Sequence, residues 1–213
     1  MSIEYIAQLL IEQNILNQEG SIKLDLANIS FPIKSKDIIG GSLQEWFENW
    51  MLKNGISFTK PQNSQEPPDF FLENGEHLEL KVFNSDATPG FDIANFDAYT
   101  RSLLQHPDRL DAHHLIFGYT SQGGFFRITD FWVKKVWEMT GPSKLNILAL
   151  QVKQSSPVNI RPKDWRGKSD IFLSRREFVL ALDKALIRFH PTRYTHWFSQ
   201  VETAYQEKTG NPL

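Results

Sequence analysis

Apolar and polar residues alternate from His77 to Val82, and this period of two predicts a half-buried β-strand over residues 76–83. A shorter phenylalanine-rich run, residues 69–73, precedes it and is also typical of a strand. Asn74 and Gly75 lie between the two runs, and this dipeptide between extended segments is a strong signal for a hairpin turn. The pattern therefore predicts two antiparallel strands joined by a tight turn.

Elsewhere, apolar residues at helical spacing, together with cap and turn signals, predict helices. The predicted helices cover residues 3–16, 41–53 with Ser42 as N-cap, 92–105, 130–139, 175–188 and part of 194–208. Further strands are predicted over residues 113–121, from residue 123 onward, over 144–154 and over 170–174. Helices come first and a mixed sheet with interspersed helices follows, which predicts one α/β (α+β) domain spanning residues 1–213.

The composition is that of an ordinary globular protein, with 40% hydrophobic and 23% charged residues. No apolar run approaches the roughly 20 residues that span a membrane, and the N-terminal stretch lacks the basic start of a secretory signal. The absence of cysteine excludes disulfides, cysteine zinc sites and thiol catalysis. We therefore expect a cytoplasmic protein without a membrane partner.

Two carboxylates and an amine interrupt the predicted hairpin, where apolar side chains would stabilise it more. Successive strand residues point to opposite faces, so Glu79 and Lys81 share one face. Pairing through the Asn-Gly turn can bring Asp69 to the same end of the sheet. Two converging carboxylates repel each other unless a divalent cation lies between them, and Mg²⁺ favours such oxygen ligands.

These three side chains form a minimal set for metal-dependent phosphodiester hydrolysis. A bound Mg²⁺ lowers the pKa of water and polarises the phosphorus, while a lysine can orient or deprotonate the attacking water or stabilise the transition state. The same residues also fit an exposed hairpin with a polar face, because Glu-x-Lys is common on solvated strands. The residues alone leave both interpretations open.

Histidines offer a weaker metal site. His113 and His114 are adjacent on a predicted strand and point to opposite faces, so they are not expected to bind one ion together. A structural or surface role is favoured for both.

Pro68-Asp69 followed by Glu79-Leu80-Lys81 resembles the signature of the PD-(D/E)xK nuclease superfamily. This resemblance implies a restriction-endonuclease-like core, in which helices flank a mixed central β-sheet. It also implies that Asp69 and Glu79 bind Mg²⁺, with Mn²⁺ able to substitute, and that Lys81 acts on the water or the transition state.

Residues 39–50, IGGSLQEWFENW, are similar to the first active-site helix of the MutH and Sau3AI-like restriction endonucleases. In that group a glycine is followed four residues later by a glutamate that adds a further carboxylate, and Gly41 and Glu45 fit this spacing. The resemblance implies that Glu45 assists catalysis and metal binding. A helix-surface glutamate is the alternative.

Residues 158–186 resemble the DNA-reading part of the same group, in which an Arg-Pro-Lys step on a strand precedes a second strand end, basic residues and a helix. Arg161 and Lys163 belong to the matching step, and the resemblance implies that Lys163 contacts bases. Phe172 stands where the relative that senses adenine methylation has a tyrosine, so methylation sensing is not implied.

Charge is distributed unevenly along the chain. Residues 1–100 hold 6 Lys/Arg and 15 Asp/Glu, whereas residues 101–213 hold 17 and 10. An acidic half and a basic half suit a protein that places cations beside a polyanion, although a chance split of solvated surfaces also fits. Basic side chains neutralise phosphates, and the expected DNA contacts are Lys153, Arg161, Lys163, Arg166, Lys168, Arg175 and Arg176.

The expected function is that of a type II restriction enzyme, a Mg²⁺-dependent, sequence-specific endonuclease that cuts double-stranded DNA and leaves 5′-phosphates. The acidic half, 1–100, would be catalytic and the basic half, 101–213, would read the duplex. Such enzymes usually act as homodimers on palindromic sites. The alternatives are a monomeric MutH-like enzyme that nicks one strand in mismatch repair, and a DNA-binding module without catalysis, in which Asp69, Glu79 and Lys81 would lie apart.

Overall fold

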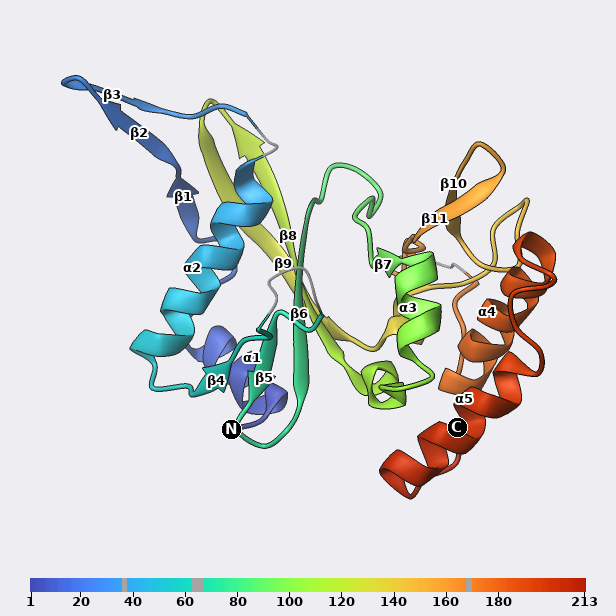
Figure 1. Ribbon diagram of the computed structural model, residues 1–213. Helices are drawn as coiled ribbons and strands as arrows, with labels where there is room; N and C mark the ends of the chain where they lie inside the picture. Colours follow the sequence, from blue (N-terminus) through green and yellow to red (C-terminus); the bar gives the residue numbers. More distant parts are fainter. Residues whose placement is uncertain (36–37, 63–66, 168–169) are drawn as a thin grey trace. The chain divides into compact units, whose positions relative to one another are not determined.

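The structure is a computed structural model and describes residues 1–35, 38–62, 67–167 and 170–213. These residues form two compact units, one made of residues 1–88 and 113–133 and the other of residues 89–112 and 134–213 (Figure 1). We call them the sheet unit and the helical unit and describe each by itself. The expected single domain over residues 1–213 stays a prediction. Within the described ranges, no helix has both the length and the apolar content needed to cross a membrane.

The sheet unit is built on a six-stranded mixed sheet. Its elements are α1 (Ile3–Glu12), β1 (Glu19–Ser21), β2 (Lys23–Leu26), β3 (Ile29–Pro32), α2 (Ile39–Lys53), β4 (Phe58–Thr59), β5 (Phe70–Leu72), β6 (His77–Asn84), β8 (His113–Gln122) and β9 (Phe125–Lys134). The strand order is β1-β9-β8-β6-β5-β4, with β6 and β8 parallel and β5 antiparallel to β6. Among the residues that the structure describes, strands β2 and β3 pair only with each other.

The core of this unit lies between the sheet and its first two helices. Leu78 and Leu80 alternate with polar residues along β6, and both are buried with Leu115 and Phe117 of β8. The buried faces of α1 and α2 pack on the same cluster, and Figure 1 shows both helices (blue and cyan) beside the sheet. The period of two thus assigns one face of β6 to the core.

The hairpin between β5 and β6 forms as the sequence predicts. Phe70 pairs with Leu78, and Phe71 pairs with His77. The turn needs a left-handed residue, and Gly75 supplies it with a φ of +86°. This local chemistry fixes the register on which the candidate active site depends.

The helical unit combines a small sheet with helices. Its elements are β7 (Ala94–Asn95), α3 (Phe96–Ser102), the 3₁₀ helices η2 (Pro107–Asp111) and η3 (Val136–Met139), β10 (Leu150–Lys153), β11 (Ser156–Ile160), α4 (Arg175–Phe189) and α5 (Trp197–Thr209). The strand order is β10-β11-β7. Helix α4 begins where Ser174 accepts a hydrogen bond from the Glu177 main-chain N–H, which is an N-cap.

Two predicted elements are wrong, and a third is shorter than predicted. The helix over 130–139 is instead the end of β9 followed by η3, because Phe131 packs on the core while Trp132 stacks on Phe83 of the other face. The strand over 144–154 is reduced to β10. Residues 170–174 are not a strand, although the Phe172 N–H donates to the Thr140 carbonyl.

Helix boundaries also differ from the prediction. Helix α1 ends at Glu12 rather than at residue 16, since Asn14 and Asn17 adopt left-handed conformations. Helix α2 begins at Ile39, so Ser42 lies inside its first turn and is not the N-cap. Helix α3 is shorter than 92–105 because Asn95 caps it, accepting a hydrogen bond from the Ala98 N–H.

Candidate active site

The β5–β6 hairpin places Asp69 beside Glu79. Extending the Phe70–Leu78 pairing by one residue sets Asp69 opposite Glu79, and residues directly opposite each other share a face of the sheet. The ladder does not continue through the main chain here. Instead, Asp69 Oδ2 accepts the Leu80 N–H at 2.7 Å. The carboxylate of Asp69 is therefore fixed to β6 itself.

Glu79 and Lys81 form a largely buried ion pair on that face. Lys81 Nζ lies 3.4 Å from Glu79 Oε2, and their side chains are 19% and 11% exposed. A charged group withdrawn from water is costly unless it is paired, and the neighbouring ammonium offsets that cost for Glu79. The interpretation of an exposed, solvated hairpin face is therefore wrong for these two residues.

Helix α2 contributes a neutral side chain to this cluster. Gln44 Nε2 donates to Asp69 Oδ1 at 2.9 Å, so each oxygen of Asp69 accepts one hydrogen bond. Glu45, the predicted third carboxylate, is the next residue and its side chain is exposed. Its metal-binding role stays a prediction. A search for acidic motifs passes over Gln44, because its function here depends on a contact 25 residues away in the chain.

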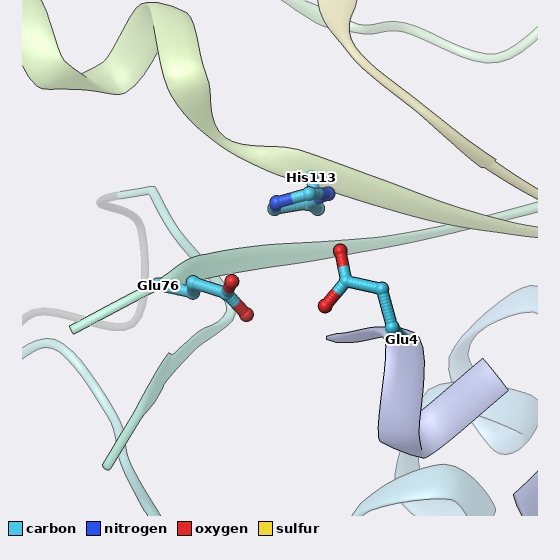
Figure 2. Close-up of side chains that lie close together, drawn as sticks. All are labelled: Glu4, Glu76 and His113. Atoms are coloured by element: carbon cyan, nitrogen blue, oxygen red, sulfur yellow. The ribbon is translucent and has the colours of Figure 1, made fainter. Parts of the chain in front are cut away.

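A second group of potential metal ligands lies at the start of β6 and β8. Glu4, Glu76 and His113 each offer one ligand atom, and these atoms lie within 4.8 Å of one another (Figure 2). The expectation that His113 and His114 face opposite ways agrees with the register, because His113 is level with Leu78 and His114 with Glu79. This cluster is separate from the Asp69 group.

Several predicted DNA contacts in the helical unit already have acidic partners. Arg161 donates to the Gly90 carbonyl and to Asp92. Arg166 holds both oxygens of Asp164 at 2.8 Å, and this hydrogen bond is the main reason that the pKa of Asp164 is lowered. Both pairs involve partly exposed side chains, where an ion pair contributes little stability.

Arg175 is the least exposed of the four arginines expected to contact DNA. It pairs with Asp111, and its guanidinium lies 4.4 Å from the ring centroid of Tyr205 and 5.1 Å from that of Trp137. The Tyr205 hydroxyl donates to the same Asp111 at 2.6 Å. These contacts give Arg175 a structural role that its place in a basic sequence does not reveal.

Arg176, in contrast, lies on the exposed side of α4. It reaches Glu202 at 3.7 Å and stacks on Phe198 of α5. The contact of Arg175 or Arg176 with DNA stays a prediction.

The two lysines expected to contact DNA are differently placed. Lys153 is exposed at the end of β10, and Lys163 is half-buried, with its main-chain N–H bonded to the Met139 carbonyl. Across the described residues, neither forms an ion pair. The Arg161–Lys163 step follows β11 rather than lying on a strand, which corrects the prediction. Lys168 lies outside the described residues.

Comparison with known proteins identifies the family. The sequence profile of the NgoBV restriction endonuclease family matches residues 1–213. The chain belongs to this family. Membership confirms the expectation of a type II restriction endonuclease, whereas the finer likeness to the MutH and Sau3AI-like group stays a prediction.

Individual relatives agree with this assignment. The chain is 36% identical over 211 residues to the type II restriction enzyme NlaIV of Neisseria lactamica, covering 94% of this chain and 87% of the relative. It is 40% identical over 139 residues to the type II restriction enzyme NgoBV of Neisseria gonorrhoeae, covering 62% and 78%. The solved NlaIV restriction endonuclease superposes with a TM-score of 0.92 at 34% identity, covering 100% of this chain and 92% of that one. The expected mixed sheet flanked by helices is therefore confirmed.

Proposed function

We propose that this NgoBV-family protein hydrolyses DNA phosphodiester bonds with Mg²⁺ and leaves 5′-phosphate ends. The observation that carries the proposal is the cluster of Asp69, Glu79 and Lys81 on one face of the β5–β6 hairpin. A DNA-binding module without catalysis predicts that these three residues lie apart. Their proximity therefore favours the nuclease.

The residues of the cluster suit a magnesium ion. Asp69 and Glu79 supply hard carboxylate oxygens, and Mg²⁺ is typically held by one or two carboxylates, several waters and substrate phosphate. From the described part of the chain, each oxygen of Asp69 accepts a single hydrogen bond, which leaves a lone pair on each. Glu45 is the candidate for a third carboxylate. When bound, the metal lowers the pKa of its water and polarises the phosphorus, and Mn²⁺ can use the same ligands.

Lys81 supplies positive charge next to the scissile phosphate. Its ammonium has three donors, one of which is directed to Glu79, so the others can orient the attacking water or bind a non-bridging phosphate oxygen. Glu79 thereby positions Lys81 as well as offering a metal ligand. Asp69 is held from two sides, by the Leu80 N–H and by Gln44, so the carboxylate is oriented before substrate arrives.

The helical unit is proposed to hold the duplex. Lys163 and Lys153 are the first choices for base and phosphate contacts, because their ammonium groups are not held by carboxylates of the described chain. Arg161 and Arg166 would have to exchange an acidic partner for a phosphate. We also propose a homodimer acting on a palindromic site, since the symmetry of a dimer mirrors that of its site.

Incubation of supercoiled plasmid with the protein, with and without Mg²⁺ or Mn²⁺, tests the proposal. Discrete double-strand fragments that appear only with metal support a type II enzyme, and sequencing their ends shows the site and the terminal phosphate. Nicked circles alone would favour the MutH-like alternative. A gel shift without any cutting would contradict the nuclease. Analytical ultracentrifugation of the protein, alone and with a duplex that contains the recognition site, tests the dimer. A mass of two chains supports the proposed homodimer.

A further inference from the structure

Three side chains from separate segments meet on the α1 side of the sheet. Glu4 comes from the first turn of α1, Glu76 from the turn that precedes β6, and His113 from the first residue of β8. Figure 2 shows the Glu4 carboxylate directed toward the His113 ring, and the carboxylate of Glu76 extending toward these two side chains. Their ligand atoms lie within 4.8 Å of one another.

Glu76 is oriented by the main chain. Its Oε2 accepts the Ile3 N–H at 2.9 Å, and its own N–H donates to the Asn74 side chain. The carboxylate therefore faces the helix N-terminus, whose unpaired N–H groups favour negative charge. A fixed carboxylate in this position lowers the entropy lost when a cation is bound.

We infer that Glu4, Glu76 and His113 form a second cation site, which binds Zn²⁺ or a similar transition-metal ion in preference to Mg²⁺. Imidazole nitrogen suits Zn²⁺, whereas Mg²⁺ selects oxygen ligands. Ligands about 2.0–2.2 Å from a tetrahedral zinc are about 3.4 Å apart. The three ligand atoms need to close by little more than an ångström to reach that separation.

This second site is distinct from the Asp69 group. His113 is level with Leu78, on the core face of β6, whereas Glu79 lies on the opposite face. Glu76 and Glu79 are three residues apart, or about 10 Å along an extended strand. An ion here would link α1, the hairpin turn and β8, so its expected effect is on stability rather than on the chemical step.

Calorimetric titration of the metal-stripped full chain with ZnCl₂, without DNA, tests the inference. We expect one equivalent of Zn²⁺ to bind at this site and the melting temperature to rise by about 5 °C at saturation. MgCl₂ should act alike on the unmodified chain and on Glu76→Gln, because Mg²⁺ held by the Asp69 group does not involve Glu76. Glu76→Gln should abolish this binding while its amide oxygen still accepts the Ile3 N–H, so that the circular dichroism spectrum is unchanged. His113→Ala should abolish binding as well.

Two exposed residues provide matched controls. Glu73→Gln changes a glutamate in the same turn, and His106→Ala removes a histidine outside the cluster. Both should bind Zn²⁺ like the unmodified chain. The inference is overturned if Glu76→Gln and His113→Ala bind as tightly as these controls, or if the unmodified chain binds no Zn²⁺. Cleavage activity does not enter the test, so its outcome is independent of the proposed function.

Discussion

In the sheet unit, the candidate active site anchors the Asp69 carboxylate to the main chain, whereas in the helical unit four arginines expected to contact DNA are paired with side-chain carboxylates. Asp69 is anchored to the Leu80 N–H and Glu79 is largely withdrawn from solvent. Arg161 and Arg166 instead form ion pairs with partly exposed carboxylates. The sheet unit carries 7 Lys/Arg and 14 Asp/Glu, and the helical unit carries 16 and 11.

This difference separates two tasks. Groups that act on a reacting phosphate have to be oriented in advance, and register within a sheet does this with few degrees of freedom. Groups that hold a polyanion can exchange one anionic partner for another. We therefore expect substitutions in the sheet unit to change the rate and metal requirement of cleavage, and those in the helical unit to change binding and discrimination.

The largest expected effect is that of Lys81→Ala. Removal of this ammonium should lower the cleavage rate by about 10³-fold, because it is the candidate group that stabilises charge at phosphorus. Affinity for DNA, measured by gel shift with Ca²⁺ in place of Mg²⁺, should stay within a factor of a few. Lys23→Ala, an exposed lysine of β2, is the control. Unchanged cutting by Lys81→Ala would refute the role of this lysine.

Asp69→Asn should lower cleavage by about 10²-fold at low Mg²⁺ and recover in part at high Mg²⁺. The amide oxygen can still accept the Leu80 N–H, so the hairpin should fold, while the charge that attracts the ion is lost. Cleavage rates measured over a series of Mg²⁺ concentrations give both the loss at low Mg²⁺ and the recovery at high Mg²⁺. Wild-type activity at the lowest Mg²⁺ concentration would show that Asp69 is only a structural cap.

Gln44→Ala should raise the Mg²⁺ concentration for half-maximal activity by about 10-fold, because it frees one side of the Asp69 carboxylate. The maximal rate should change less. Glu45→Gln, at the next position, tests whether Glu45 is a metal ligand or an exposed residue without a role in metal binding. An equal shift for Glu45→Gln supports a third carboxylate, whereas no shift for Gln44→Ala would contradict the positioning role of Gln44.

Lys163→Ala should reduce discrimination between cognate and unrelated DNA by about 10-fold, with a smaller loss of affinity for unrelated DNA. Competition binding at fixed salt measures both quantities. Lys184→Ala, on the exposed face of α4, should change neither. An equal loss on all sequences would make Lys163 a phosphate contact rather than a base contact.

The smallest expected effect is on stability at high pH and concerns Tyr205, which contacts Arg175 and Asp111. Burial, helped by the hydrogen bond to Asp111, raises the pKa of Tyr205 from 10.0 to about 12. The folded state therefore favours the neutral phenol. Its contribution is complete below pH 10 and is lost as the pH rises toward 12, because the unfolded chain ionises first.

Tyr205→Phe should flatten this part of the pH dependence. Urea unfolding at pH 8, 10 and 11 measures it, and Tyr5→Phe, at an exposed position, is the control. An identical pH slope in Tyr205→Phe and the unmodified chain would contradict the prediction.

The sequence predicts the fold best where local signals suffice. The β5–β6 hairpin combines alternation with an Asn-Gly turn, and α4 has apolar residues at helical spacing, so the sequence predicts both. The helix predicted over 130–139 is wrong because its short apolar run is compatible with either periodicity. The deciding contact is the stacking of Trp132 on Phe83, which lies in a distant part of the chain.

The same limit applies to the candidate site. The sequence predicts that Asp69, Glu79 and Lys81 lie together, because the register of the β5–β6 hairpin determines their positions. Gln44 could not, since a neutral amide has no motif and its contact depends on how α2 packs. Arg175 appears in sequence as one of many cations, and its enclosure by Asp111 and Tyr205 depends on tertiary structure.

The Asp69 carboxylate occupies the place of the next main-chain acceptor in the hairpin ladder, and this makes the length of the connection a chemical constraint. A surface turn usually tolerates an added or a lost residue. Here a slip of one position would turn Asp69 toward the face that carries Leu78 and Leu80, away from Glu79. We therefore expect a glycine inserted beside Gly75 to abolish cleavage, although every ionisable group is retained.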